Sequence, residues 1–287
     1  MKPYKAIPIL KERIWGGQKL KQYNKVFEGT NVGESWETDK DTMPVLIKLI
    51  DANDILSVQV HPNDALAQEL EGQRYGKTEA WIVLDCDEGA ELVAGIKPGT
   101  TPEKLEQALL EGSVQQQLNR IKVKKGDCIY IPAGTVHSLG KGVLVYEVQQ
   151  PSDLTYRLYD WDRTDDCGKP RELHIHKALK CIDYSVSALE VKNIYQFDIK
   201  PQKMEMIFRS KYFITSYLRL SGNEYFDIDS NSFTALTAIS GSAYIIADGS
   251  RELMVPGDTW IIPKGCQITL ENNQDCEFIF TERLQND

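Results

Sequence analysis

The sequence predicts a mainly β protein made of two related β units, with a few helices inserted in and following the first unit. Three observations predict this fold class. Short apolar runs alternate with turn residues, helix signals occur at only two places, and one segment of the first half recurs in the second. The 287 residues suffice for two modest domains. We expect the first unit over 1–188 and the second over 189–287.

Strand-like segments dominate the first unit. They are rich in Val, Ile, Leu and Tyr, and Gly, Pro, Asn, Asp or Lys separates one from the next. The clearest six are 45–50, 55–61, 80–85, 91–96, 128–134 and 143–150. Runs of this length and composition, bounded by turn residues, indicate strands.

Helix signals interrupt this pattern twice. Thr101 is a capping residue, Pro102 suits a first helical turn, and the apolar period that follows ends at Gly112. We therefore expect a helical insertion near 101–119. A second helical stretch is predicted near 173–186, after which the chain becomes strand-like again.

An internal repeat supports two copies of one β unit. Segment 126–137, GDCIYIPAGTVH, recurs as GDTWIIPKGCQI at 257–268, with the Gly-Asp start and the Pro-x-Gly turn retained. His137 of the first copy corresponds to Ile268 of the second. Any chemistry of this histidine is therefore restricted to the first unit.

Composition excludes several classes of protein. The chain has 33 Lys and Arg against 42 Asp and Glu, a net charge of -9, so a nucleic-acid or anionic-membrane surface is not expected. No apolar run reaches the roughly 20 residues of a membrane helix, and the first residues lack a signal-peptide core, which favours the cytoplasm. Scattered cysteines without a C-x-x-C pair indicate reduced thiols: Cys86, Cys128, Cys167, Cys181, Cys266 and Cys276.

Two strand-like segments place polar side chains where a core is expected. In 55–61, alternation puts Ser57, Gln59 and His61 on one face, opposite Leu56, Val58 and Val60. In the segment that begins KTEAW, Lys77 and Glu79 share a face. A buried carboxylate and ammonium group need partners, because burying an unpaired charge is costly.

A metal ion would satisfy these groups. His61, Glu79 and His137 offer two imidazoles and a carboxylate, and Gln59 adds an amide oxygen, which leaves room for water or substrate as in catalytic zinc sites. Each histidine alone would more often be a hydrogen-bonded structural residue. The rival pair, His174 and His176, begins a helical run and has no matching carboxylate nearby in the sequence.

Further charged residues follow His137 along the chain. Glu147 shares a face with the apolar valines of its strand, and alternation after Pro151 aligns Asp153, Thr155, Arg157 and Tyr159.

Lys48, Lys77 and Arg157 predict a small cationic pocket in this acidic protein. The alternatives are that Lys48 is a surface lysine of an edge strand and that Arg157 forms an ion pair with Asp153.

The repeated motif resembles the second motif of cupin barrels, which implies a double-stranded β-barrel, or jelly roll, for both units. QVHPND, KTEAW, PAGTVH and SDLTYRLYDW together resemble the type I phosphomannose isomerases in their short bacterial form. The resemblance covers most of residues 5–180, including WGG at 15–17 and GESWE at 33–37. The large helical insertion of the long members is absent.

This resemblance implies one Zn²⁺ per chain, held by His61, Glu79 and His137 with Gln59 as the fourth ligand of many members. It also implies that Arg157 is the active-site arginine. The positions that resemble the substrate pocket of the family are Lys48, Ser57, Lys77, Glu147 and Asp153.

The implied reaction interconverts mannose 6-phosphate and fructose 6-phosphate through a cis-enediol. Lys77 and Arg157 would bind the phosphate or stabilise the enediolate. We hypothesise that Glu147 moves the proton, although Asp153, Lys77 and a zinc-bound water are also eligible.

An iron-dependent redox cupin and a non-catalytic sugar-phosphate-binding cupin are the other interpretations. No oligomeric state is predicted.

Overall fold

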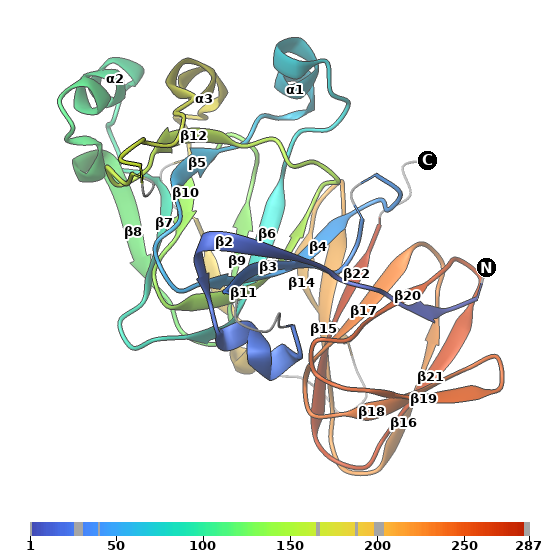
Figure 1. Ribbon diagram of the computed structural model, residues 1–287. Helices are drawn as coiled ribbons and strands as arrows, with labels where there is room; N and C mark the ends of the chain where they lie inside the picture. The colour runs from blue at the N-terminus through green and yellow to red at the C-terminus, as the bar shows by residue number, and fades with distance from the viewer. Residues whose placement is uncertain are drawn as a thin grey trace.

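Four antiparallel sheets, arranged as two pairs, make up the protein (Figure 1). The computed structural model describes residues 2–25, 31–39, 41–164, 167–186, 189–197 and 204–283. One pair of sheets forms the first unit, and the second pair, orange to red in Figure 1, forms the other. The predicted fold class, mainly β with two jelly-roll units and a few helices, is confirmed.

The first unit contains a seven-stranded and a five-stranded sheet. The larger sheet has the order β13 (Val191–Asn193), β9 (Asp127–Ile131), β6 (Glu79–Cys86), β11 (Val143–Gln149), β4 (Leu46–Ala52), β3 (Val32–Trp36) and β2 (Ile9–Gly17). The smaller sheet has the order β12 (Tyr156–Tyr159), β5 (Val58–Val60), β10 (His137–Leu139), β7 (Glu91–Ile96) and β8 (Leu118–Lys122). Each of the six predicted strand segments overlaps one of these strands.

The second unit has the same construction from a six-stranded and a four-stranded sheet. The larger sheet has the order β1 (Tyr4–Lys5), β20 (Thr259–Ile262), β17 (Thr234–Ser240), β22 (Cys276–Glu282), β15 (Ile214–Leu220) and β14 (Met204–Arg209). The smaller sheet has the order β16 (Glu224–Asp229), β21 (Gln267–Asn272), β18 (Ala243–Ala247) and β19 (Ser250–Met254).

Three α-helices lie along the outer face of the five-stranded sheet (Figure 1). The helix α2 (Pro102–Leu110) starts where predicted, because the Thr101 hydroxyl accepts a hydrogen bond from the Lys104 amide. The 3-10 turn η2 (Val114–Gln117) follows it, and α3 (Ile175–Cys181) lies within the second predicted stretch. The sequence analysis missed α1 (Asp64–Glu71), an eight-residue helix capped by Asn63 directly after β5. Two further 3-10 turns are η1 (Lys19–Tyr23) and η3 (Ile194–Gln196).

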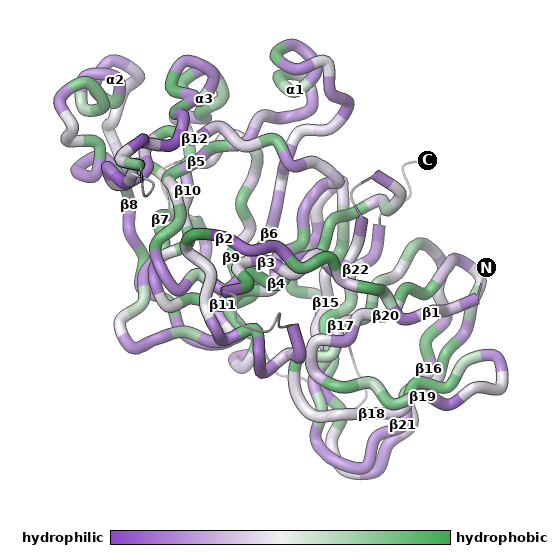
Figure 2. Tube along the Cα trace, in the orientation of Figure 1, coloured by the Kyte–Doolittle hydropathy of each residue, from purple (hydrophilic) through white to green (hydrophobic). Residues whose placement is uncertain are grey.

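Apolar cores alternate with the sheets. One core lies between the two sheets of the first unit and another between those of the second. A third core lies between the seven-stranded sheet of the first unit and the six-stranded sheet of the second. Its members include Ile47, Tyr146, Phe213 and Ile279. In Figure 2 hydrophobic residues follow the strands, whereas the turn at the far end of the second unit is hydrophilic. The second unit thus packs against the first through apolar strands.

The two units also exchange strands at their junction. The N-terminal β1 pairs with β20 of the second unit, and β13 pairs with β9 of the first. A domain boundary at 188/189 therefore assigns β1 and β13 each to a different unit from the sheet in which it pairs. None of the helices in the described part of the chain has the length and apolarity of a membrane span.

The shared core predicts that the two units unfold together. Ile279→Ala should lower the free energy of unfolding by about 2–5 kcal/mol, because the side chain is fully buried and its loss leaves a cavity. Urea unfolding followed by tryptophan fluorescence checks this, since four of the five tryptophans lie in the first unit: Trp15, Trp36, Trp81 and Trp161. The matched control Ile7→Ala, at a side chain 90% exposed, should change stability by less than about 0.5 kcal/mol. An unchanged fluorescence transition in Ile279→Ala would show that the units unfold independently.

Candidate active site

Three strand ends bring His61, Glu79 and His137 together. His61 directly follows β5, Glu79 opens β6 and His137 opens β10. Glu79 pairs with Ile131, the last residue of β9, and the Pro-x-Gly turn after Ile131 leads to His137. The turn is fixed to the neighbouring loop by a hydrogen bond from the Gly134 amide to the His61 carbonyl, 2.9 Å.

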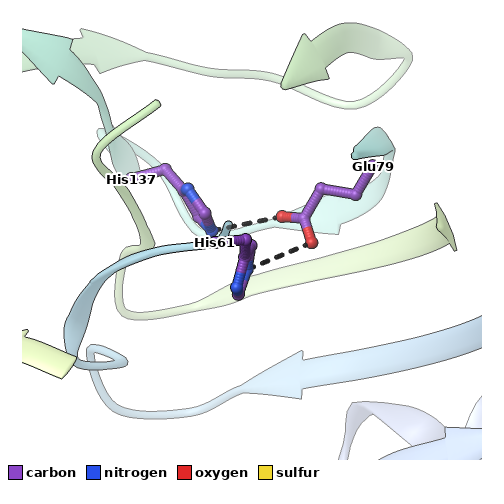
Figure 3. A group of neighbouring side chains, drawn as sticks. All are labelled: His61, Glu79 and His137. Atoms are coloured by element: carbon purple, nitrogen blue, oxygen red, sulfur yellow. Dashed lines mark ion pairs between the residues drawn. The ribbon is translucent and has the colours of Figure 1, made fainter. Parts of the chain in front are cut away.

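The three side chains face one another across a completely buried space (Figure 3). Glu79 Oε2 lies 3.4 Å from His61 Nε2, and Glu79 Oε1 lies 3.2 Å from His137 Nε2. One ligand atom from each residue lies within 4.8 Å of the others. Among the described residues, this is the only such group of three or more His, Cys, Asp and Glu side chains.

The outer nitrogens of both imidazoles bind backbone carbonyls. His61 Nδ1 lies 2.8 Å from the Leu154 oxygen, and His137 Nδ1 lies 2.8 Å from the Thr135 oxygen. A carbonyl can only accept, so each Nδ1 carries the proton and each Nε2 presents a lone pair to the shared space. This arrangement orients both rings as metal ligands.

The donor set fits a divalent metal ion. Both carboxylate oxygens of Glu79 and Nε2 of His61 are buried without a well-directed hydrogen bond, which is costly unless a further group is bound. Two imidazoles and a carboxylate are typical ligands of catalytic zinc. The Gln59 amide, with its nitrogen 3.3 Å from His137 Nε2, would present oxygen to the same space after a flip of the amide.

Lys77 controls the charge of this group. Its Nζ lies 2.8 Å from Glu79 Oε2, and the side chain is 4% exposed. Burial alone would raise the pKa of Glu79, but the charge of Lys77 outweighs burial and holds that pKa well below its ordinary value. Burial, reinforced by Lys77, lowers the pKa of His61 to about 3. Burial also lowers the pKa of His137, so both imidazoles are neutral near pH 7.

A cavity of about 350 Å³ lies next to these residues. Gln59, 3.3 Å from His137, and Lys77, 2.8 Å from Glu79, belong to its wall. All seven remaining residues predicted for the site line this one cavity: Lys48, Ser57, Gln59, Lys77, Glu147, Asp153 and Arg157.

Glu147 occupies the centre of a buried charge cluster on the cavity wall. Its Oε2 accepts a hydrogen bond from the Trp81 indole at 2.7 Å, and its Oε1 lies 3.2 Å from Lys48 Nζ and 4.0 Å from Lys77 Nζ. Lys48 is 3% exposed on β4, which lies between β11 and β3. The alternative that Lys48 is a surface lysine of an edge strand was therefore wrong.

Arg157 extends from β12 opposite Gln59. The guanidinium donates to the Glu172 carbonyl at 2.6 Å, and its Nε is buried without a hydrogen bond. Within the described part of the chain no ion pair joins Arg157 to Asp153, whose carboxylate lies 3.9 Å from Lys48 instead. His174 accepts a hydrogen bond from the Arg157 amide at 3.1 Å, so it supports the arginine and is not part of the metal group.

The sequence analysis missed two other arginines of the cavity, Arg13, which pairs with Glu34 at 2.7 Å, and Arg171. Asp160, 5% exposed, orients Arg171 by accepting from Nε at 2.7 Å and also from a terminal nitrogen, and it binds Arg163 at 2.6 Å. Burial and the like charge of Arg171 lower the pKa of Arg157. Two guanidiniums thus lie at one cavity close enough to repel each other. The acidic DWDR segment after β12 was the only sequence signal for this cluster.

Tyr159 does not share the strand face that alternation predicts for it with Thr155 and Arg157. The register between β12 and β5 shifts after Arg157, so that Arg157 pairs with Gln59 but Tyr159 pairs with the neighbouring Val58. Tyr159 therefore packs in the apolar core beneath the helices and is absent from the cavity. The prediction was wrong because a bulge breaks the alternation on which it relied.

The repeat folds as predicted, but the second unit lacks the metal donors. Gly126 and Gly257 have positive φ of 87° and 92°, and Gly134 and Gly265 have 91° and 82°. Gly265 donates to the Ser230 carbonyl as Gly134 does to His61, and Thr234 pairs with Ile262 as Glu79 does with Ile131. The positions of the first metal group are thus occupied by Ser230, Thr234 and Ile268.

Comparison with known proteins agrees with this site. Residues 8–80 match the family described as phosphomannose isomerase type I, catalytic domain. Over 94% of this chain and 96% of the relative, the sequence is 35% identical to the mannose-6-phosphate isomerase ManA of Bacillus subtilis. The chain belongs to the type I phosphomannose isomerase family.

Two further relatives support membership of this isomerase family. A Streptococcus mutans mannose-6-phosphate isomerase is 44% identical over 54% of this chain and 51% of its own. The crystal structure of the mannose 6-phosphate isomerase from Bacillus subtilis superimposes with a TM-score of 0.82 at 28% identity, covering 98% of this chain and all of the other. The predicted family resemblance is confirmed, and the chain is an isomerase.

The lowered pKa of His61 predicts an acid-sensitive fold for the metal-free protein. Below about pH 6.5 an unfolded histidine binds a proton that His61 does not bind until about pH 3, so the free energy of unfolding should fall as the pH drops through this range. The lowered pKa of Glu79 acts in the same direction below its ordinary value of 4.5. Urea unfolding at about pH 7 and about pH 5.5 measures the effect.

The His61→Gln variant should show a flatter pH dependence than the parent chain. His176→Gln is the matched control, because His176 is exposed on α3. A parental pH dependence in His61→Gln would assign the acid sensitivity to other groups.

Proposed function

We propose that this isomerase interconverts mannose 6-phosphate and fructose 6-phosphate with one Zn²⁺ per chain. The observation that carries the proposal is the buried His61, Glu79 and His137 group next to a cavity with five basic side chains in a chain of this family. Those side chains are Arg13, Lys48, Lys77, Arg157 and Arg171. A cytoplasmic location belongs to the proposal, because charged sugar phosphates do not cross a membrane unaided.

The zinc ion would be held by His61, Glu79 and His137, with Gln59 as the fourth ligand. Bound there, it would act as a Lewis acid toward the substrate oxygens on which negative charge develops. The outer hydrogen bonds of His61 and His137 keep their Nε2 atoms available without any change of tautomer.

The phosphate would bind to the guanidiniums of Arg157 and Arg171. Arginine offers a planar fork of donors that matches phosphate, and the Nε of Arg157 is a buried donor without a partner. Arg171 is already oriented by Asp160, so little side-chain freedom would be lost on binding. An anion between the two guanidiniums would also relieve their mutual repulsion.

Lys77 would stabilise the enediolate. Its ammonium lies 2.8 Å from Glu79 and 4.0 Å from Glu147, which places it between the metal group and the proposed base. Burial alone would lower the pKa of Lys77, but Glu147 and Glu79 raise it above its ordinary value, so the side chain is a permanent cation and cannot serve as a base near neutral pH. Lys48, Ser57 and Asp153 would bind the sugar hydroxyls from the same cavity.

Glu147 is the proposed proton carrier between C2 and C1. Its Oε2 is held by the Trp81 indole, whereas its buried Oε1 accepts no hydrogen bond and is paired with Lys48 Nζ at 3.2 Å. The carboxylate therefore has one oxygen that sets its position and one on the cavity wall, next to Lys48, that would take up the proton. Asp153 is the competing candidate, but its side chain is 50% exposed and would exchange protons with solvent more readily.

Metal-dependent turnover is the first test. The purified protein should isomerise mannose 6-phosphate, lose that activity on removal of metal by a chelator, and regain it with added Zn²⁺. A coupled assay for fructose 6-phosphate measures the rate. Absence of turnover in fully zinc-loaded protein would favour a non-catalytic sugar-phosphate-binding cupin, and activity restored only by iron with uptake of oxygen would favour a redox cupin.

Glu147→Gln should lower kcat by about 10²–10⁴-fold, because general acid–base catalysis contributes about this much and the amide cannot take up the proton. The amide can still accept the hydrogen bond from Trp81, so the zinc content should stay at the parental value. Asp153→Asn is the matched comparison and should lose less activity. If instead Asp153→Asn loses more activity than Glu147→Gln, the proton carrier is Asp153.

A further inference from the structure

Asp64 is a hydrogen-bond centre that the proposed reaction does not use. It begins α1 and lies outside the cavity. Its Oδ1 accepts from the Gly76 amide at 2.9 Å and from the Gln150 side chain at 2.8 Å. Its Oδ2 accepts from the Tyr212 hydroxyl at 2.8 Å and lies 3.9 Å from Lys211 Nζ. One carboxylate therefore joins three loops of the first unit to one loop of the second.

Each of the three loops carries residues of the active site. The Asp64 loop begins with His61, and the Gly76 loop leads through Lys77 to Glu79. The Gln150 loop connects Gln149, at the end of β11, to the segment with Asp153 and Arg157. A displacement of Asp64 would thus change the relative positions of metal ligands and charged residues that come from different strands.

The same loops are joined to one another by backbone contacts. The Lys77 amide donates to the Pro62 carbonyl at 2.9 Å, and the Thr78 amide donates to the Gln150 side chain at 2.9 Å. Gly76 packs so closely that a Cβ atom would lie 2.3 Å from the Pro62 oxygen. These contacts connect the loop of Asp64 directly to the backbone of Lys77 and Thr78, the residues before Glu79.

The loop of the second unit that carries Tyr212 is held by hydrogen bonds of its own. The tyrosine lies in the loop between β14 and β15, where the amides of Tyr212 and Phe213 both donate to the Ser210 hydroxyl at 3.1 Å. Phe213 is fully buried in the core that joins the two units. The hydroxyl of Tyr212 is therefore presented to Asp64 from an anchored loop.

We propose that Tyr212 is a positioning residue of the active site, through which the second unit orients the loops of His61 and Glu79. The inference rests on the proposed function for its kinetic test, but not for its metal-binding test. It assigns a role to a unit whose own metal positions are Ser230, Thr234 and Ile268. Tyr212 touches neither the cavity nor the metal group, so it acts only through Asp64.

The test is Tyr212→Phe, which removes one hydroxyl and retains the ring. Zinc affinity, measured by competition with a chelator, should fall by about 10- to 100-fold, as is usual when the hydrogen bonds behind metal ligands are lost. With mannose 6-phosphate, kcat should fall by about 10- to 100-fold, because small misplacements far from the chemistry have effects of this size. The KM should change less than about twofold, since the guanidiniums of Arg157 and Arg171 are held directly by the Glu172 carbonyl and by Asp160.

Tyr225→Phe is the matched control. It removes a hydroxyl that donates to Glu271 at 3.3 Å on the exposed face of the second unit, and it should leave zinc affinity and kcat unchanged. Thermal unfolding of both variants identifies a temperature at which each is fully folded. Zinc affinity and kcat are compared at that temperature. Parental zinc affinity and kcat in folded Tyr212→Phe would overturn the inference, whether or not its melting temperature is lower.

The two proposals fail in different ways. A parent protein that binds zinc but does not isomerise the sugar phosphate would overturn the proposed function, and the zinc affinities of Tyr212→Phe and Tyr225→Phe would still decide the inference. An active parent with an unaffected Tyr212→Phe variant would overturn the inference alone. The variant Asp64→Asn provides a second measurement, because its side-chain nitrogen cannot accept the hydrogen bond from whichever donor it faces and should weaken zinc binding in the same direction.

Discussion

The buried carboxylate of Glu79 is the constraint on which the rest of the first unit depends. A charge with no exposed surface is very costly unless cations and hydrogen-bond donors surround it. Lys77 supplies one cation at 2.8 Å, and the two imidazoles contribute lone pairs, which attract a metal ion but not a carboxylate. The three side chains that meet at these strand ends could therefore hold a metal ion.

The two units share the turns of the repeat but differ in the side chains at the positions of His61, Glu79 and His137. Both have the same Gly-Asp start, the same left-handed glycines and the same hydrogen bonds through the Pro-x-Gly turn. In the second unit the Ser230 hydroxyl lies 3.1 Å from that of Thr234, so the short polar side chains satisfy each other. This unit packs its larger sheet against the first unit and supplies part of the shared core.

The cationic cavity accounts for how an acidic protein could bind an anionic substrate. The net charge of -9 repels anions at long range, but one cavity of about 350 Å³ is lined by five basic side chains and three acidic ones. The basic ones are Arg13, Lys48, Lys77, Arg157 and Arg171, and the acidic ones are Glu34, Glu147 and Asp153. Glu147 lies between the two lysines, and Asp160 orients Arg171 from outside the cavity lining, so both carboxylates fix the positions of cations.

The sequence by itself determined the features that depend on local periodicity. Alternation along 55–61 and from Lys77 placed Gln59, His61 and Glu79 on the cavity side, and the cap at Thr101 predicted α2, because strand pleat and helix capping involve residues close in the sequence.

Only the tertiary structure decided the remaining features. Arg171 reaches the cavity through a loop without periodicity, the bulge in β12 reverses Tyr159, and Tyr212 meets Asp64 from 148 residues away. Such contacts depend on how sheets pack and where a register shifts, and these are properties of the assembled core that no short segment encodes.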